Sequence, residues 1–130
     1  MLKRIDHIGI VVQDLEAARR SFEALGMNVE RIQEVPDRPV KAAFLPLGDS
    51  DVELLQPLTS DGDLAQFLEE HGEGIHHICI EVEDIQAALA AVKSRGIQLR
   101  EAQPRQGASG RIAFLHPGST HGVLIEFVEK

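Results

Sequence analysis

Two histidines and two glutamates of this sequence fit the chemistry of a divalent metal site. His7 and His77 lie 70 residues apart, and Glu53 and Glu126 lie 73 residues apart. Each glutamate stands between apolar neighbours, which is typical of a strand whose polar side chain points to the opposite face. A buried carboxylate without a partner is costly, and a bound cation removes that cost. Two imidazoles and two carboxylates suit a divalent ion with open positions for water and substrate.

An internal repeat relates the two halves of this residue set. The segment IDHIGIVVQDLEAARRSFEALGMNVE returns as IHHICIEVEDIQAALAAVKSRGIQLR at an offset of 70, and AFL at 43–45 returns at 113–115. Three extra residues in a later loop bring VEL at 52–54 onto IEF at 125–127. A register held over this length indicates a duplicated module of about sixty residues. Because duplicated strands present equivalent positions to a common cleft, we predict that the four residues form one site.

Each copy predicts a strand, a helix and then three strands. Apolar alternation predicts strands at 5–12 and 75–82, and Asp14 and Asp84 are suited to cap the helices that follow. Gly26 and Gly96 stand where these helices would end. Further strands are expected at Val29–Val35, Val40–Leu47, Asp51–Gln56, Gln98–Ala102, Arg111–His116 and Gly122–Val128. A helix at Asp63–Glu70 would link the copies, and Gln103–Gly110 is the most loop-like segment.

These elements predict an α+β fold of two tandem βαβββ modules that form a curved mixed sheet around a metal-binding cleft. The first module covers about residues 1–60, the linking helix about 61–71 and the second module about 72–130. A chain of 130 residues is the size of one ordinary domain, so we expect a single domain.

The composition limits the partners and the compartment. Thirteen basic and 21 acidic residues give a formal charge of −8, which argues against nonspecific nucleic-acid binding. An anionic ligand would therefore need a local basic patch. The apolar run near the N-terminus is too short to span a membrane, so we expect no membrane partner. Cys79 is the single cysteine and cannot form an intrachain disulfide, which favours the reducing cytoplasm.

Other polar residues near the four have plainer interpretations. A lone histidine or glutamate on a strand is more often a hydrogen-bonded or surface residue, and only the repeat raises the four above that background. Alternation places Asp6, His76 and Gln56 on the opposite faces of their strands from the predicted ligands. Cys79 shares the face of His77 and is expected to be a small buried residue. Surface positions are expected for the remaining three, His116, His121 and Glu81.

The stretches IDHIGIVVQDLEAA, FLPLGDSDVELLQP, GEGIHHICIEVEDI and RIAFLHPGSTHGVLIEF resemble the methylmalonyl-CoA epimerases of the vicinal oxygen chelate, or glyoxalase-like, superfamily. The resemblance runs over nearly the whole chain, and GIHHICIEV and FLHP followed by GVLIEF are its most specific parts. Position by position, it places the metal ligands on His7, Glu53, His77 and Glu126, where some members have Gln at the Glu53 position.

The resemblance also implies a reaction and its catalytic residues. Such an enzyme interconverts the two C2 epimers of methylmalonyl-CoA through a metal-stabilised thioester enolate. Glu126 corresponds to the family's base and ligand. Epimerisation needs acid/base groups on both sides of a planar intermediate, and Glu53, the repeat counterpart of Glu126, is our candidate for the second. The metal is a divalent ion among Co, Ni, Mn, Zn and Mg, and analogy to the family predicts a homodimer.

The sequence departs from the family pattern at two places. An acid on the preceding strand of a well-known member would fall near Lys41, and the run from 38 to 45 contains no carboxylate. Gly118 stands where many relatives carry Lys. If that lysine holds a substrate anion, another cation must do so here, and Lys41, Arg105 and Arg111 are candidates by position.

Three alternatives remain at this point. Glyoxalase I, which acts on the glutathione adduct of methylglyoxal, also uses two histidines and two glutamates. An extradiol dioxygenase needs two histidines and one carboxylate, so a fourth ligand argues against it. A metal-free binding or resistance module of the same fold would not need all four residues.

Overall fold

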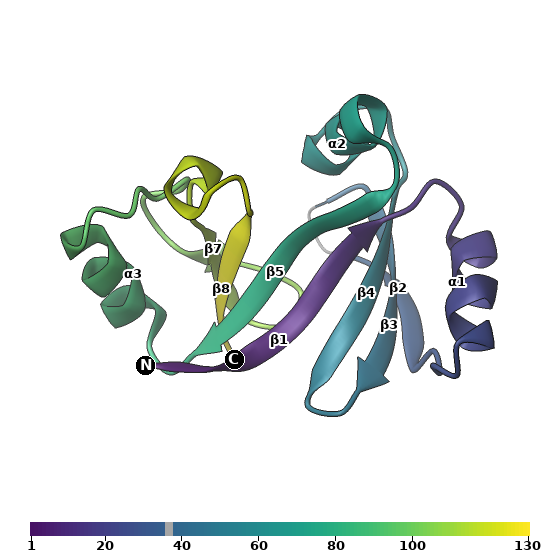
Figure 1. Cartoon of the computed structure of the whole chain (residues 1–130), viewed down its shortest axis with the longest axis horizontal. Helices are drawn as coiled ribbons and strands as arrows, with labels where there is room; N and C mark the ends of the chain where they lie inside the picture. The colour runs from purple at the N-terminus through teal and green to yellow at the C-terminus, as the bar shows by residue number, and fades with distance from the viewer. Residues whose placement is uncertain (36–37) are drawn as a thin grey trace. The chain divides into compact units, whose positions relative to one another are not determined.

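The computed structural model of this protein describes residues 1–35 and 38–130. Its elements in chain order are β1 (Leu2–Val11), α1 (Leu15–Ala24), β2 (Arg31–Glu34), β3 (Val40–Leu47), β4 (Ser50–Pro57), α2 (Asp63–His71), β5 (Gly74–Val82), α3 (Ile85–Ser94), β6 (Arg105–Gln106), β7 (Arg111–Phe114), the 3₁₀ helix η1 (Pro117–Thr120) and β8 (Ile125–Glu129) (Figure 1). No helix among the described residues is long and apolar enough to cross a membrane.

The chain divides into two units that have the same strand order. The first unit is His7–His76, and the second unit is Met1–Asp6 together with His77–Lys130. The first unit has the order β2-β3-β4-β1, and the second has β6-β7-β8-β5 followed by the start of β1. The pairs β1–β4 and β5–β8 are parallel, whereas β2–β3, β3–β4, β6–β7 and β7–β8 are antiparallel. The predicted α+β class with two βαβββ modules and mixed strand pairing is confirmed.

Strand register confirms the alignment of the two copies. Glu53 on β4 lies opposite Gly9 on β1 and Phe44 on β3. Glu126 on β8 lies opposite Cys79 on β5 and Phe114 on β7, the positions that the repeat predicts. The three extra residues of the second copy fall in the β7–β8 connection, which contains η1, whereas a turn at residues 48 and 49 joins β3 to β4.

The helices begin and end where the sequence predicts. The side chain of Asp14 accepts a hydrogen bond from the Ala17 N–H at 3.2 Å, and Asp84 accepts one from the Ala87 N–H at 3.1 Å. Such caps satisfy N–H groups that have no partner within the helix. Gly26 and Gly96 follow α1 and α3 with φ of +106° and +91°, a backbone conformation that glycine adopts without steric cost.

Each unit places a helix on one face of its strands and a second apolar cluster on the other face. Leu15 of α1 packs on Ala43 and Leu54, and Ile85 of α3 packs on Ala113 and Phe127 (Figure 1). The opposite strand faces carry two other clusters, which include Val40, Ala42, Phe44 and Leu55 in the first unit and Cys79, Ile112, Phe114 and Val128 in the second. By alternation, Glu53 and Glu126 belong to these opposite faces.

The predicted strand at Gln98–Ala102 is wrong. Only Leu99 forms an isolated bridge, with Leu115, and the short strand β6 lies at Arg105–Gln106 inside the segment predicted to be a loop. The Glu101 side chain accepts a hydrogen bond from the Phe114 N–H at 3.2 Å. A side chain thus occupies the backbone donor that a continuous strand would have used. The edge of β7 is therefore paired with two short pieces of chain.

Replacing Gly110 by Ala is expected to destabilise the protein by about 1–3 kcal/mol, the usual cost of overpacking. A Cβ atom at this position would lie 2.3 Å from the Glu129 carbonyl oxygen, and backbone cannot move aside cheaply. Urea unfolding followed by far-ultraviolet circular dichroism would measure the loss, since the chain has no Trp or Tyr. Gly74→Ala is the control, because a Cβ there meets nothing within 4 Å. Equal stability of the two variants would contradict this prediction.

Candidate active site

The first unit holds one of the two predicted histidine–glutamate pairs. His7 lies on β1 and Glu53 on β4, which run parallel and side by side. The His7 Nδ1 atom lies 3.1 Å from Glu53 Oε2, and the two residues are 8% and 9% exposed. The neighbours of Glu53 on β4, Val52 and Leu54, pack in the cluster beneath α1. Alternation therefore directs Glu53 to the other face of the strands, as the sequence predicts.

The second unit repeats this arrangement with His77 on β5 and Glu126 on β8. The His77 Nε2 atom lies 3.2 Å from Glu126 Oε1, and the residues are 6% and 5% exposed. Ile125 and Phe127, which flank Glu126, pack in the cluster beneath α3. The four predicted site residues thus form two buried pairs, one in each unit.

The donors of both pairs fit a divalent metal ion. Imidazole nitrogens and carboxylate oxygens are the ligands that Co, Ni, Mn and Zn accept, and each pair supplies one of each kind. Each carboxylate lies within hydrogen-bonding distance of one imidazole nitrogen, and both carboxylates are largely out of water. Such carboxylates can accept a proton from a substrate more readily than solvated ones, because burial disfavours the charged form.

A phenylalanine and an arginine accompany each pair, and sequence analysis did not single them out. Phe44 lies opposite Glu53, with the Arg31 guanidinium carbon 3.9 Å from its ring centre. Phe114 lies opposite Glu126 and meets the His77 ring edge-on at a centroid distance of 5.8 Å. The Arg105 guanidinium carbon lies 5.9 Å from the Phe114 ring centre. The repeated AFL could have identified the two rings, but no pattern in the sequence indicates the arginines.

Asp6 and Glu81 are buried in the second unit as parts of an ion-pair network. Asp6 is 3% exposed and lies 3.0 Å from Arg4 Nη2 and 2.6 Å from Lys130 Nζ. Glu81 lies 2.8 Å from Arg4 Nε and 3.5 Å from Lys3 Nζ. The expected surface position of Glu81 is wrong, because residues 3 and 4 cover it and balance its charge. The network ties both chain ends to β5.

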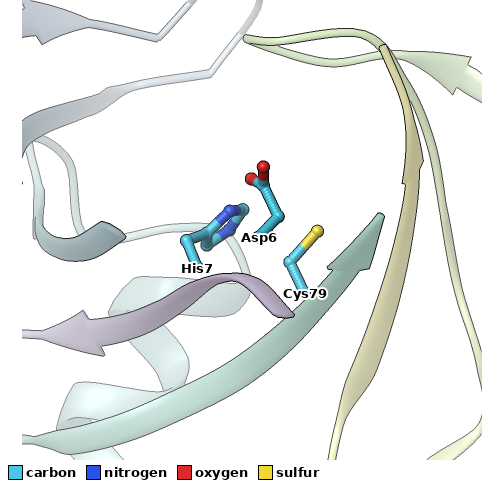
Figure 2. A group of neighbouring side chains, drawn as sticks. All are labelled: Asp6, His7 and Cys79. Carbon is cyan, nitrogen blue, oxygen red and sulfur yellow. The ribbon is translucent and has the colours of Figure 1, made fainter. Parts of the chain in front are cut away.

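Cys79 is fully buried, as predicted. Its Sγ atom lies within 4.8 Å of an Asp6 carboxylate oxygen, and Figure 2 shows the two side chains of the second unit next to each other. The small thiol fills the row of β5 and β8 that contains Glu126. Its packing role in the cluster with Phe114 and Val128 accounts for its burial.

The remaining histidines lie apart from the two pairs. His76 stacks edge-on against Phe67 at 5.2 Å, on the strand face opposite His77. His116 is exposed, and its Nδ1 atom accepts a hydrogen bond from the Gly118 N–H at 2.9 Å at the start of η1. His121 is also exposed. The expected surface positions of His116 and His121 are confirmed.

The three candidate cations fall on different faces. Lys41 alternates with Ala42 on β3 and shares the face of Ala43, which packs beneath α1. Arg111 shares the face of Ala113, which packs beneath α3. Arg105 lies over Phe114, on the face that holds His77 and Glu126.

Residues 6–114 match the model of the Glyoxalase/Bleomycin resistance protein/Dioxygenase superfamily. The chain is 42% identical to the ethylmalonyl-CoA/methylmalonyl-CoA epimerase of Cereibacter sphaeroides, over 97% of each chain. The structure of methylmalonyl-CoA epimerase from Mycobacterium tuberculosis superposes with a TM-score of 0.91 at 33% identity, over 98% of this chain and 88% of that one. The Streptomyces coelicolor enzyme in complex with 2-nitronate-propionyl-CoA superposes with a TM-score of 0.90 at 36% identity, over 100% of this chain and 99% of that one. This chain therefore belongs to the glyoxalase/bleomycin resistance/dioxygenase superfamily and, within it, to the methylmalonyl-CoA epimerase family of enzymes.

Proposed function

We propose that this protein interconverts the two C2 epimers of methylmalonyl-CoA, and that His7, Glu53, His77 and Glu126 together hold a divalent metal ion. The observation that carries the proposal is the repetition of one buried histidine–glutamate pair at equivalent register positions in both units. The relatives named methylmalonyl-CoA epimerase, and the structure of one with an acyl-CoA analogue, support the substrate class.

The reaction removes a proton from the carbon next to a thioester carbonyl, which places negative charge on the carbonyl oxygen. A divalent ion at the site supplies a Lewis acid for that oxygen. The protein's own residues move the proton. Glu126 acts on one side of C2, and Glu53 acts on the other side, because inversion requires that the proton leaves one face of the planar enolate and returns to the other.

The packing around the two glutamates suits this role. Phe44 and Phe114 lie opposite them on the neighbouring strands and are 1% and 5% exposed. Their rings exclude water from the carboxylates and so limit competing proton exchange with solvent. The imidazoles of His7 and His77 hold the carboxylates in place from the other side.

Proton NMR of methylmalonyl-CoA in D₂O tests this function. The purified protein is expected to remove the C2 proton signal, to lose this activity after treatment with a chelator, and to regain it on addition of cobalt. Persistence of the C2 signal with the metal-loaded protein would contradict the proposal. Conversion of the glutathione hemithioacetal of methylglyoxal would then favour glyoxalase I. A cytoplasmic location and a homodimer stay predictions.

A further inference from the structure

We infer that Arg105 binds the free carboxylate of the methylmalonyl group, an inference that rests on the proposed function. The substrate carries a carboxylate on the reacting carbon, and the protein carries a formal charge of −8. A local cation is therefore needed to offset the repulsion of an anionic substrate. The second unit provides one next to its histidine–glutamate pair.

Arg105 lies on the same strand face as the proposed chemistry. Its guanidinium lies over the Phe114 ring, and the edge of the same ring system meets His77. Phe114 pairs directly with Glu126 across β7 and β8. A carboxylate bonded to C2 must lie close to Glu126 when that residue takes the C2 proton. The CoA phosphates, in contrast, lie at the far end of the pantetheine arm.

Glu101 orients Arg105 and leaves part of its guanidinium available. One Glu101 carboxylate oxygen accepts a hydrogen bond from Arg105 Nε at 2.6 Å, and the other accepts one from the Phe114 N–H. Because Glu101 is itself held by β7, it fixes the guanidinium relative to the strand. Within the described residues, no hydrogen bond occupies the two Nη groups. These groups form a planar fork that matches a carboxylate.

The other nearby arginines fit this role less well. Arg31 lies flat against Phe44 and already donates to Glu30 and Gln33. Arg111 belongs to the strand face beneath α3, and its Nη1 atom lies 3.9 Å from a Glu129 carboxylate oxygen. Its side chain is 44% exposed and that of Arg105 is 43% exposed. Arg111 is therefore a matched control, equal in charge and exposure but directed to the opposite face.

The test compares the binding of two thioesters to the metal-loaded protein by isothermal titration calorimetry. Methylmalonyl-CoA carries the carboxylate, whereas propionyl-CoA lacks it and keeps the phosphates. Arg105→Ala is expected to weaken methylmalonyl-CoA binding by about tenfold to a hundredfold, the value of a charge-assisted hydrogen bond. Propionyl-CoA binding should stay within about twofold, as for a solvated surface charge. Arg105→Lys should recover part of the affinity, because it restores the charge without the fork.

Two results would overturn the assignment. Arg105→Ala could weaken methylmalonyl-CoA binding no more than Arg111→Ala does, which would show that no contact exists. It could also weaken both thioesters equally, which would assign the contact to a phosphate. These results differ from failure of the proposed function, in which the wild-type protein itself would not exchange the C2 proton of methylmalonyl-CoA.

Discussion

A Glu126→Gln variant is expected to interconvert the two epimers of methylmalonyl-CoA about a thousandfold more slowly than the wild-type protein, within the range for loss of a general base. The substitution keeps the size of the side chain and an oxygen that can face His77, now 3.2 Å from the carboxylate. It removes the group that accepts the proton. The rate of epimer interconversion, followed from each pure epimer, measures the effect.

Glu129→Gln is the matched control on the same strand. Glu129 lies three residues along β8, on the opposite face, and accepts a hydrogen bond from the Ile85 N–H at 2.8 Å. In the first unit Gln56 occupies the equivalent position and accepts from the Leu15 N–H at the same distance. A glutamine therefore already performs this structural task once in the chain. If Glu126→Gln kept a tenth or more of the wild-type rate, roughly, it would not be the base.

The duplication explains why so much of the fold was predictable. One strand and helix pattern, read twice at a fixed offset, predicts which strands correspond, and the pairing of Glu53 with Phe44 and of Glu126 with Phe114 confirms that correspondence. The helix caps were predictable because Asp14 and Asp84 act on N–H groups three residues away. Both kinds of signal are local, so no knowledge of the folded chain is needed.

The features that sequence analysis missed depend on contacts between distant residues. Glu81 is buried because Arg4 and Lys3, more than 70 residues away, pair with it. The strand predicted at Gln98–Ala102 fails because the Glu101 side chain bonds the Phe114 backbone. Neither interaction repeats in the first copy. An unrepeated long-range contact leaves no pattern in a single sequence.

The two units are equivalent in their histidine–glutamate pairs but differ in the arginines beside them. Arg31 has its hydrogen-bonding groups engaged by Glu30 and Gln33, whereas Arg105 is held at Nε alone. A symmetric pair of acid/base groups suits a reaction whose two directions are mirror images at C2. An asymmetric cation suits a substrate that must bind with its carboxylate in one direction. Duplication followed by divergence of the flanking residues can supply both.

Replacing Glu53 by Gln is expected to abolish epimer interconversion while largely sparing metal binding. The amide oxygen can still serve as a ligand, but it cannot take or return a proton. Because Glu126 remains, the variant should still exchange the C2 proton of one epimer with deuterium and return it to the same face. Glu126→Gln should retain exchange, if any, with the opposite epimer. NMR of each pure epimer in D₂O, combined with analysis of its configuration, separates exchange from inversion.

Metal content of Glu53→Gln, measured by inductively coupled plasma mass spectrometry, distinguishes loss of a base from loss of the ion. The matched control is Gln56→Glu, which makes the reverse change three residues along β4, on the face beneath α1. A carboxylate is favourable there, because Gln56 accepts from the first N–H of a helix and Glu129 does the same in the second unit. Inversion by Glu53→Gln at a rate close to that of the control would show that another group returns the proton. Loss of the metal together with inversion would instead assign Glu53 the role of ligand alone.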